Sequence, residues 1–204
     1  NICSHWNGYW NGFLNIFEQA NVSTSDRFLT STIYSWQGET LGSLSMTLSP
    51  HTQFDLLVHD LPERRSDEYG TFCTNQNGIA NDVEARMVFY KLEDGSTLID
   101  PRFDFAYSLD AESGLTGLQG VLFNTVQPSL DPADQGNVIA NWLIVSNWST
   151  TERKGTLTLF DRDGVLLTTM SLTVPAKGER HVAAHEVAAN MFGLAIFEPE
   201  DNES

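Results

Sequence analysis

The N-terminal stretch from His5 to Phe13 has the most unusual side-chain chemistry in the chain, with aromatic rings set among asparagines and glycines. The rings that could contact a sugar or a partner protein are Trp6, Tyr9, Trp10 and Phe13. Rings that stack on pyranose faces beside amides that bind hydroxyls suit carbohydrate binding. Trp and Tyr are also common interface anchors, so an arm that docks on a neighbouring molecule is a second hypothesis. A third is that Trp6 and Trp10 cover an open end of the core, which the burial preference of Trp favours.

Aspartates on two loops could supply the oxygen ligands that Ca²⁺ prefers. They are Asp131 and Asp134 in one loop and Asp161 and Asp163 in the other. Neither loop has the EF-hand spacing, and an Asp-x-Asp-Gly run also forms a type I turn in which a side chain caps the turn amides. The sequence therefore predicts no cofactor, with calcium at these loops as the alternative.

Histidines give little indication of catalysis. His59 and His185 each precede an acid, but they occupy equivalent positions of an internal repeat, which favours a structural role such as binding a turn carbonyl. His181 and His185 could share a metal, yet no third ligand is evident. The chain contains no Gly-x-Ser-x-Gly, phosphate-loop, His-Glu-x-x-His or Cys-x-x-Cys motif, so we expect a protein that is not an enzyme.

The two cysteines, Cys3 and Cys73, are 70 positions apart. They are either independent buried thiols or one disulfide that joins the N-terminal arm to a strand. Lysine is scarce, while Ser, Thr, Asn and Gly are abundant, as in many secreted proteins. Disulfides persist in that environment, so the composition favours the disulfide, which would stabilise the fold by about 4 kcal/mol in the loop-entropy model.

The overall composition excludes some classes of partner. The chain has 204 residues, with 27 acidic and 11 basic side chains and a formal net charge of −16. Such a surface repels phosphates, so we expect no binding to nucleic acid. No apolar run approaches the roughly 20 residues of a membrane span. At 41% hydrophobic residues, the chain can bury a substantial core.

Alternating apolar and polar residues predict antiparallel strands with one face on a core. In residues 44–48 the apolar side chains are at even positions, and in residues 103–109 the large side chains are at odd positions. Glycine-containing turns separate these runs, and the one helix-compatible stretch, around residues 183–191, is short. The pattern predicts an all-β protein.

An internal repeat is the strongest single signal in the sequence. Residues 13–61 align without a gap with residues 139–187, and 12 of the 49 aligned pairs are identical. Average residue usage would give about three identities. The sequence therefore contains a duplicated unit of four or five strands.

Three motifs are shared by the two copies. They are an Asn-x-Ser-Thr strand end at Asn21 and Asn147, an aromatic-x-x-x-Gly hairpin, and a Ser-x-Thr-Leu/Val strand. With these motifs, residues 13–75 and 139–197 resemble the extracellular immunoglobulin-like repeats of bacterial surface proteins. The resemblance implies an antiparallel immunoglobulin-like β-sandwich outside the cell. Asn21 and Asn147 are also formal N-glycosylation acceptors, as is Asn202.

We expect two β-sandwich units, residues 1–112 with the N-terminal aromatic arm and a shorter unit over residues 113–204. Two further strands follow the first copy, whereas the second copy has none after its fifth strand and is preceded by a strand at residues 118–125. The units could share strands in one sandwich, or the second could be complete but smaller. Alternatively, the second could take a strand from a neighbouring molecule.

Together these features predict a secreted or cell-surface structural or adhesive β-sandwich protein. We expect it to associate with itself, in a filament or a surface layer. The alternative is a carbohydrate-binding module that binds a polysaccharide through the N-terminal aromatic residues. Because the net charge makes copies repel one another, assembly is expected to depend on salt or cations.

Overall fold

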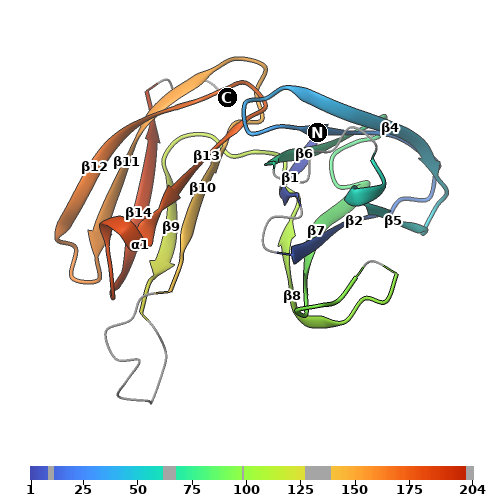
Figure 1. The fold of residues 1–204 in the computed structure, drawn as a ribbon. Helices are drawn as coiled ribbons and strands as arrows, with labels where there is room; N and C mark the ends of the chain where they lie inside the picture. The colour runs from blue at the N-terminus through green and yellow to red at the C-terminus, as the bar shows by residue number, and fades with distance from the viewer. Residues whose placement is uncertain (9–11, 62–67, 98, 127–138, 201–204) are drawn as a thin grey trace. The chain divides into compact units, whose positions relative to one another are not determined.

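The structure is a computed structural model that describes residues 1–8, 12–61, 68–97, 99–126 and 139–200 (Figure 1). The chain divides into two compact units, Asn1–Gly114 and Leu115–Ser204. No helix in the described ranges is long and apolar enough to cross a membrane.

Unit 1 is built from two four-stranded antiparallel sheets. One has the strand order β1-β6-β3-β4 and the other the order β5-β2-β7-β8. The strands are β1 (Ile2–Asn7), β2 (Phe13–Asn21), β3 (Arg27–Tyr34), β4 (Thr40–Leu48), β5 (Gln53–Leu57), β6 (Tyr69–Gln76), β7 (Val83–Leu92) and β8 (Phe103–Asp110). A 3-10 turn over Val58–Asp60 follows β5.

The core of unit 1 lies between these two sheets. Its fully buried side chains include Trp6, Phe17, Phe72, Met87 and Phe89. Phe17 in β2 and Phe72 in β6 come from different sheets, and their ring centroids lie 4.5 Å apart. The inward positions of the alternating strands thus supply the core, as expected for half-buried antiparallel strands.

Unit 2 repeats this architecture with fewer strands. Its larger sheet has the order β12-β11-β14-β9, and its smaller sheet pairs β10 with β13. The elements are β9 (Gln119–Asn124), β10 (Trp142–Ser146), β11 (Arg153–Asp161), β12 (Leu166–Val174), β13 (Glu179–Ala183), α1 (Ala184–Val187) and β14 (Phe192–Pro199). Its core includes Phe123, Leu143, Leu157, Leu159 and Ala195.

The strand positions confirm the duplicated unit. Moving β4 and β5 by 126 positions places them on β12 and β13 with the same bounds. The bulge after Ile33 in β3 has a counterpart after Leu159 in β11. The predicted all-β, sandwich-like fold with a repeated unit is therefore confirmed.

Beyond the hydrophobic pattern, the two copies also share a glycine at equivalent places, Gly70 and Gly193. A Cβ atom on Gly70 would overlap the carbonyl oxygen of Tyr34, and one on Gly193 would overlap that of Phe160. Tyr34 and Phe160 are themselves repeat-equivalent, since 34 + 126 = 160. Only glycine allows this close approach of two neighbouring strands.

Among its described residues, unit 2 has no counterpart of β7 and β8. The strand expected at residues 118–125 is β9, which pairs with β14 as β1 pairs with β6. β10 pairs with β13 as β2 pairs with β5. In unit 1 the other edge of β2 pairs with β7, whereas β10 has no such partner in the described part of the chain.

Candidate interaction surface

The N-terminal aromatic residues that the structure describes do not form a free arm. β1 is part of a sheet, and Trp6 is fully buried with its indole N–H donating to the Tyr34 carbonyl oxygen at 2.8 Å. The expectation that Trp6 contacts a partner or a sugar is corrected, because its ring covers the core. Phe13 is partly buried against the same core. Tyr9 and Trp10 lie outside the described residues.

Cys3 and Cys73 form the disulfide that the composition favoured. The two residues face each other in the β1–β6 register, with their Cα atoms 4.1 Å apart. The bond therefore joins the N-terminal strand to its neighbour in the sheet. Such a bond is compatible with a protein outside the cell.

Asp161 binds the backbone of its own turn. Its Oδ1 accepts hydrogen bonds from the N–H groups of Asp163 at 2.9 Å and Val165 at 2.8 Å. The side chain of Asp163 is 72% exposed. The turn-capping alternative thus accounts for Asp161, and nothing in this loop encloses Asp163. Asp131 and Asp134 lie outside the described residues.

His185 binds the backbone, as the sequence led us to expect. Its Nδ1 lies 3.2 Å from both the N–H nitrogen and the carbonyl oxygen of Asn141, and the tautomer decides which bond forms. The ring also packs edge-on to Trp142, with 5.4 Å between centroids. These contacts place His185 in a structural role beside β10.

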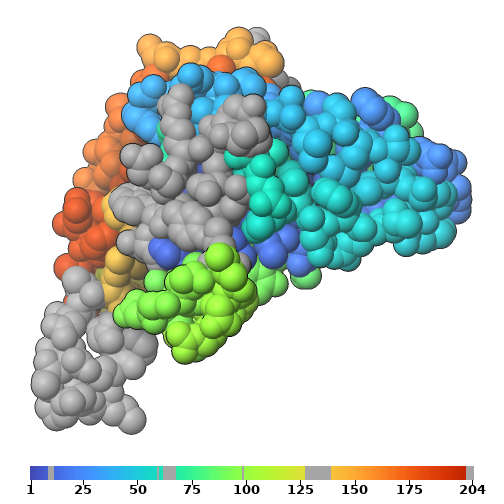
Figure 2. Space-filling view, turned by 45° about the vertical axis from the view of Figure 1, so that its right-hand side comes forward, coloured from blue at the N-terminus to red at the C-terminus, as the bar shows by residue number. Residues whose placement is uncertain are grey.

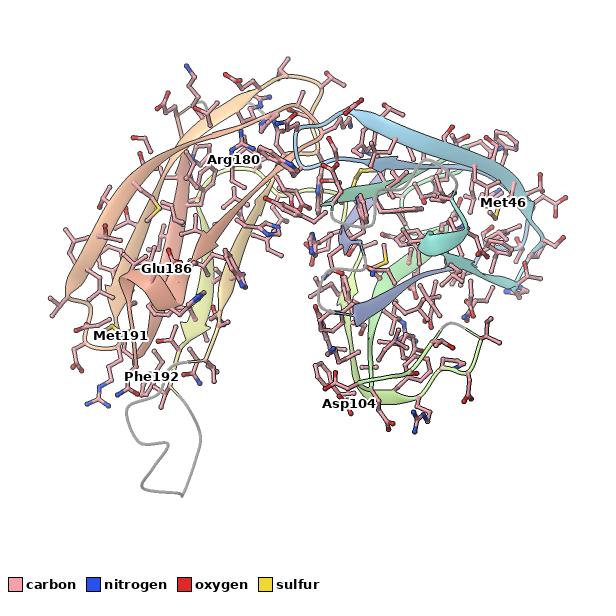
Figure 3. All side chains as sticks on the ribbon, viewed as in Figure 1. Met46, Asp104, Arg180, Glu186, Met191 and Phe192 are labelled. Atoms are coloured by element: carbon pink, nitrogen blue, oxygen red, sulfur yellow. A yellow bond between two sulfur atoms is a disulfide. The ribbon has the colours of Figure 1, made fainter. Side chains whose placement is uncertain are left out.

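Edge strand β8 carries a row of exposed apolar side chains. All eight of its residues are exposed, and Phe105 (54%), Tyr107 (42%) and Leu109 (38%) share one face. Phe103 lies beyond a register shift between β7 and β8 and packs against Tyr90 instead. β8 pairs with β7 on one side, and no described strand pairs with its other edge. Figure 3 labels Asp104 at the beginning of this strand. The sequence alternation predicted the strand but not the exposure of its apolar face.

The exposed row is held in place by aromatic residues of the neighbouring strands. Tyr107 stacks on Phe89 of β7, with 4.7 Å between centroids and 14° between ring planes. Phe13 of β2 lies 6.0 Å from the rings of both Phe105 and Tyr107 in edge-on contacts. Because Phe89 is fully buried, the row is a continuation of the inner face of the sheet. The surface is therefore preformed.

Polar groups border this aromatic surface. Lys91 Nζ lies 5.9 Å from the centroid of Phe13. Partial burial raises the pKa of Tyr107 above its ordinary value. A tyrosine hydroxyl can donate a hydrogen bond at neutral pH with or without this shift. A shallow hollow lined by Gly12 and residues 91–96 adjoins the ring of Phe13. In Figure 2 the yellow-green connection between β7 and β8 lies at the surface of unit 1.

Within the described residues of unit 2, one edge of β10 pairs with no strand. Leu143 points into the core of unit 2, where it is buried, whereas Trp142 and Ile144 on the opposite face are 49% and 37% exposed. In unit 1 the strand that pairs with the equivalent edge is β7. Its residues Met87 and Phe89 are fully buried. The repeat was the sequence signal for this edge, because two further strands follow the first copy and none was expected after the fifth strand of the second.

Known proteins give little help with function. The chain matches no protein-family model and no curated protein. One solved structure, titled "Crystal Structure of Thermotoga maritima 1070", is similar with a TM-score of 0.39 and 10% identity. That match covers 52% of this chain and 82% of the other. So distant a likeness carries no functional argument.

Proposed function

We propose that this protein is a secreted or cell-surface structural subunit that associates with copies of itself through unpaired strand edges. The observation that carries the proposal is β8, which is exposed over its full length with an apolar row on one face. An edge strand presents unpaired N–H and C=O groups, which are a template for another strand. Monomeric proteins commonly protect such edges with Lys or Pro, and Phe103–Asp110 contains neither.

The preformed aromatic surface supports association. Contiguous apolar surface on a soluble domain marks a site of interaction, and aromatic anchors dominate the energetics of protein interfaces. The rings of Phe105 and Tyr107 are already fixed by Phe13 and Phe89, so binding would cost little side-chain entropy. In the part of the chain that the structure describes, no strand pairs with one edge of β10, which gives each copy a second place where a strand could add.

Two features support a location outside the cell. The Cys3–Cys73 disulfide is the type of bond that persists in oxidising environments. The low lysine content and the abundance of Ser, Thr, Asn and Gly agree with it. A net charge of −16 keeps such a protein dispersed at low salt, so assembly is expected to strengthen as salt rises.

The test is the mass of the protein across concentration and salt. We expect sedimentation velocity to show association that increases with concentration, and Tyr107→Lys to weaken it at least about tenfold, because the charge would lie in the centre of the row. Ile79→Lys, a change at an apolar residue that is 75% exposed outside β8, is the matched control and should leave association unchanged. A native protein that remains monomeric at every concentration and salt would contradict the proposal.

Carbohydrate binding is a second candidate, because the exposed rings of Phe105 and Tyr107 adjoin Phe13 and the polar hollow next to it. Aromatic rings with an apolar face and nearby polar groups suit a sugar ring. Phe105→Ala would then reduce retention on a polysaccharide affinity gel without changing the mass of the protein. Retention that is the same for the native protein and Phe105→Ala would remove this candidate.

A further inference from the structure

Two strands of unit 1 connect edges that stay unpaired in the described part of unit 2. In unit 1, β7 pairs with β2, β8 pairs with β7, and Glu112, just after β8, exchanges backbone hydrogen bonds of 2.8 and 2.9 Å with Cys3 of β1. In unit 2, β10 takes the place of β2 and β9 the place of β1. We call the place that corresponds to β7 and β8 the hairpin position. Within the described residues, no strand fills it.

The exposure of β9 shows what the hairpin covers in unit 1. β1 and β9 have the same register against their repeat-equivalent neighbours β6 and β14, so Ser4 corresponds to Val121. Ser4 is 3% exposed, and its hydroxyl donates to the Leu109 carbonyl oxygen of β8 at 3.4 Å. Val121 is 54% exposed. An apolar side chain of unit 2 is thus open to solvent where β8 covers its counterpart in unit 1.

Backbone groups of β10 face the hairpin position. Just after the strand, the N–H of Asn147 donates to the Gly178 carbonyl oxygen on the β13 side at 2.9 Å. Backbone groups of successive residues alternate between the two sides of a strand. The even-numbered residues therefore direct their N–H and C=O groups away from β13, and they are Trp142, Ile144 and Ser146. A second strand can pair with them, as β7 pairs with β2.

On the outer face, β10 differs from β2 in charge. Glu18 of β2 forms an ion pair with Arg86 of β7, with 2.6 Å between Oε2 and Nε. The repeat counterpart of Glu18 is Ile144. An arginine in the place of Arg86 would find no carboxylate on β10, whereas an apolar side chain there would pack against Ile144. The strand that fits β10 is therefore apolar at this place.

On the core side, β10 keeps the apolar character of β2. Phe17 of β2 lies opposite Met87 of β7, and both side chains are fully buried. The counterpart of Phe17 is Leu143, which packs in the core of unit 2. β9 and β10 contain no charged residue. The strand that fits beside β10 is therefore uncharged and apolar on both of its faces.

Two edges have to be satisfied at once, which selects the kind of partner. An occupant that pairs with β10 on one side and with β9 on the other is two strands wide, and both of its outer edges are free before it binds. β8 of a folded second copy offers at most one free edge, since its other edge pairs with β7. A separate β-hairpin offers both.

We infer that unit 2 binds a β-hairpin of another polypeptide at the hairpin position, with one strand on β10 and the other on β9. The hairpin residue in the place of Met87 lies opposite Leu143, and an apolar residue in the place of Arg86 lies opposite Ile144. Strand addition of this kind takes its affinity from main-chain hydrogen bonds and its specificity from alternate side chains. The site is separate from β8, so the inference goes beyond the proposed self-association and does not depend on it.

Binding of a synthetic hairpin tests the inference. The probe is a fluorescently labelled peptide with the sequence of residues 83–110, which contain β7 and β8 in unit 1, carrying Arg86→Val to match Ile144. Fluorescence anisotropy should show that the native protein binds this peptide about fivefold more tightly than the peptide that keeps Arg86. The same peptide with Met87→Asp is the matched control. It should bind at least about tenfold more weakly, because its carboxylate would enter the core.

An exchange of charge between protein and peptide tests the register. Ile144→Glu recreates the acidic residue of β2, so this variant should bind the peptide that keeps Arg86 about fivefold more tightly than the Arg86→Val peptide, which reverses the native preference. Ile144 is 37% exposed, and circular dichroism will confirm that the variant is folded. Ile79→Glu, a change at an exposed residue of unit 1, is the matched control and should leave the native preference unchanged. A preference that Ile144→Glu does not reverse would overturn the register.

The outcomes are distinct from those that decide the proposed function. A native protein that binds none of the peptides would overturn the inferred site, whereas sedimentation without peptide decides self-association. Equal binding of the Arg86→Val and Met87→Asp peptides would show a contact away from the core side of β10, and it would also overturn the site. The expected preference, together with its reversal by Ile144→Glu, would support both the site and the register.

Discussion

The asparagine of the Asn-x-Ser-Thr motif is a hydrogen-bonding centre of the fold. In unit 1, Asn21 Nδ2 donates to the carbonyl oxygens of Ser25 at 2.8 Å and Leu48 at 2.9 Å, and its Oδ1 accepts from the N–H and hydroxyl of Ser23. Asn147 makes corresponding bonds in unit 2. A glycan on Nδ2 would displace donated bonds inside a buried turn. The motif therefore has a structural role at both places.

We expect Asn21→Ala to lower the free energy of unfolding of unit 1 by about 2–3 kcal/mol. The change removes the donor for two carbonyl oxygens and the acceptor for the Ser23 turn, which leaves buried polar groups without partners. Urea denaturation followed by circular dichroism measures the effect. Asn75→Ala, at an exposed position of β6 in the same unit, should change stability by less than about 0.5 kcal/mol. Equal effects of the two changes would contradict this role of Asn21.

At the level of elements, alternation and the repeat predicted strands well where one face is buried. The period-2 runs at residues 44–48 and 103–109 lie in β4 and β8. The alternation could not show that the apolar face of β8 is uncovered, because it records which side chains share a face and not what packs on that face. Whether other residues cover that face depends on how the two sheets pack, which is a property of the tertiary structure.

The N-terminal segment was predicted as an arm because its sequence does not alternate. In β1 the four consecutive residues from Cys3 to Trp6 are all buried, so both faces of the strand are covered. A strand buried on both faces gives no alternation in the sequence. The cluster of aromatic residues after it therefore suggested a surface for partners, although Trp6 is part of the core.

Strand pairing in unit 2 depends on the close approach at Gly193. We expect Gly193→Ala to destabilise unit 2 by about 3 kcal/mol, because the added Cβ would overlap the Phe160 carbonyl oxygen in the neighbouring strand β11. Gly120→Ala in β9 is the control, since its Cβ would meet Leu194 Cδ1 at an ordinary 3.6 Å. Thermal unfolding of the variants measures both. A Gly193→Ala protein as stable as Gly120→Ala would show that the strands can separate without cost.

For the whole molecule, the net charge of −16 opposes association between copies at low salt. It keeps a protein with unpaired edges dispersed, as a net charge far from zero does for many soluble proteins.

The division into two units predicts that reduction acts on one unit alone. Cys3–Cys73 lies within unit 1, and opening a loop of this size should cost that unit about 4 kcal/mol. Each unit has its own core, so calorimetry with reductant should lower the unfolding temperature of unit 1 and leave that of unit 2 unchanged. Gly193→Ala identifies the transition of unit 2, and Cys3→Ser with Cys73→Ser should abolish the response to reductant. A single transition that shifts as a whole would show that the two units unfold together.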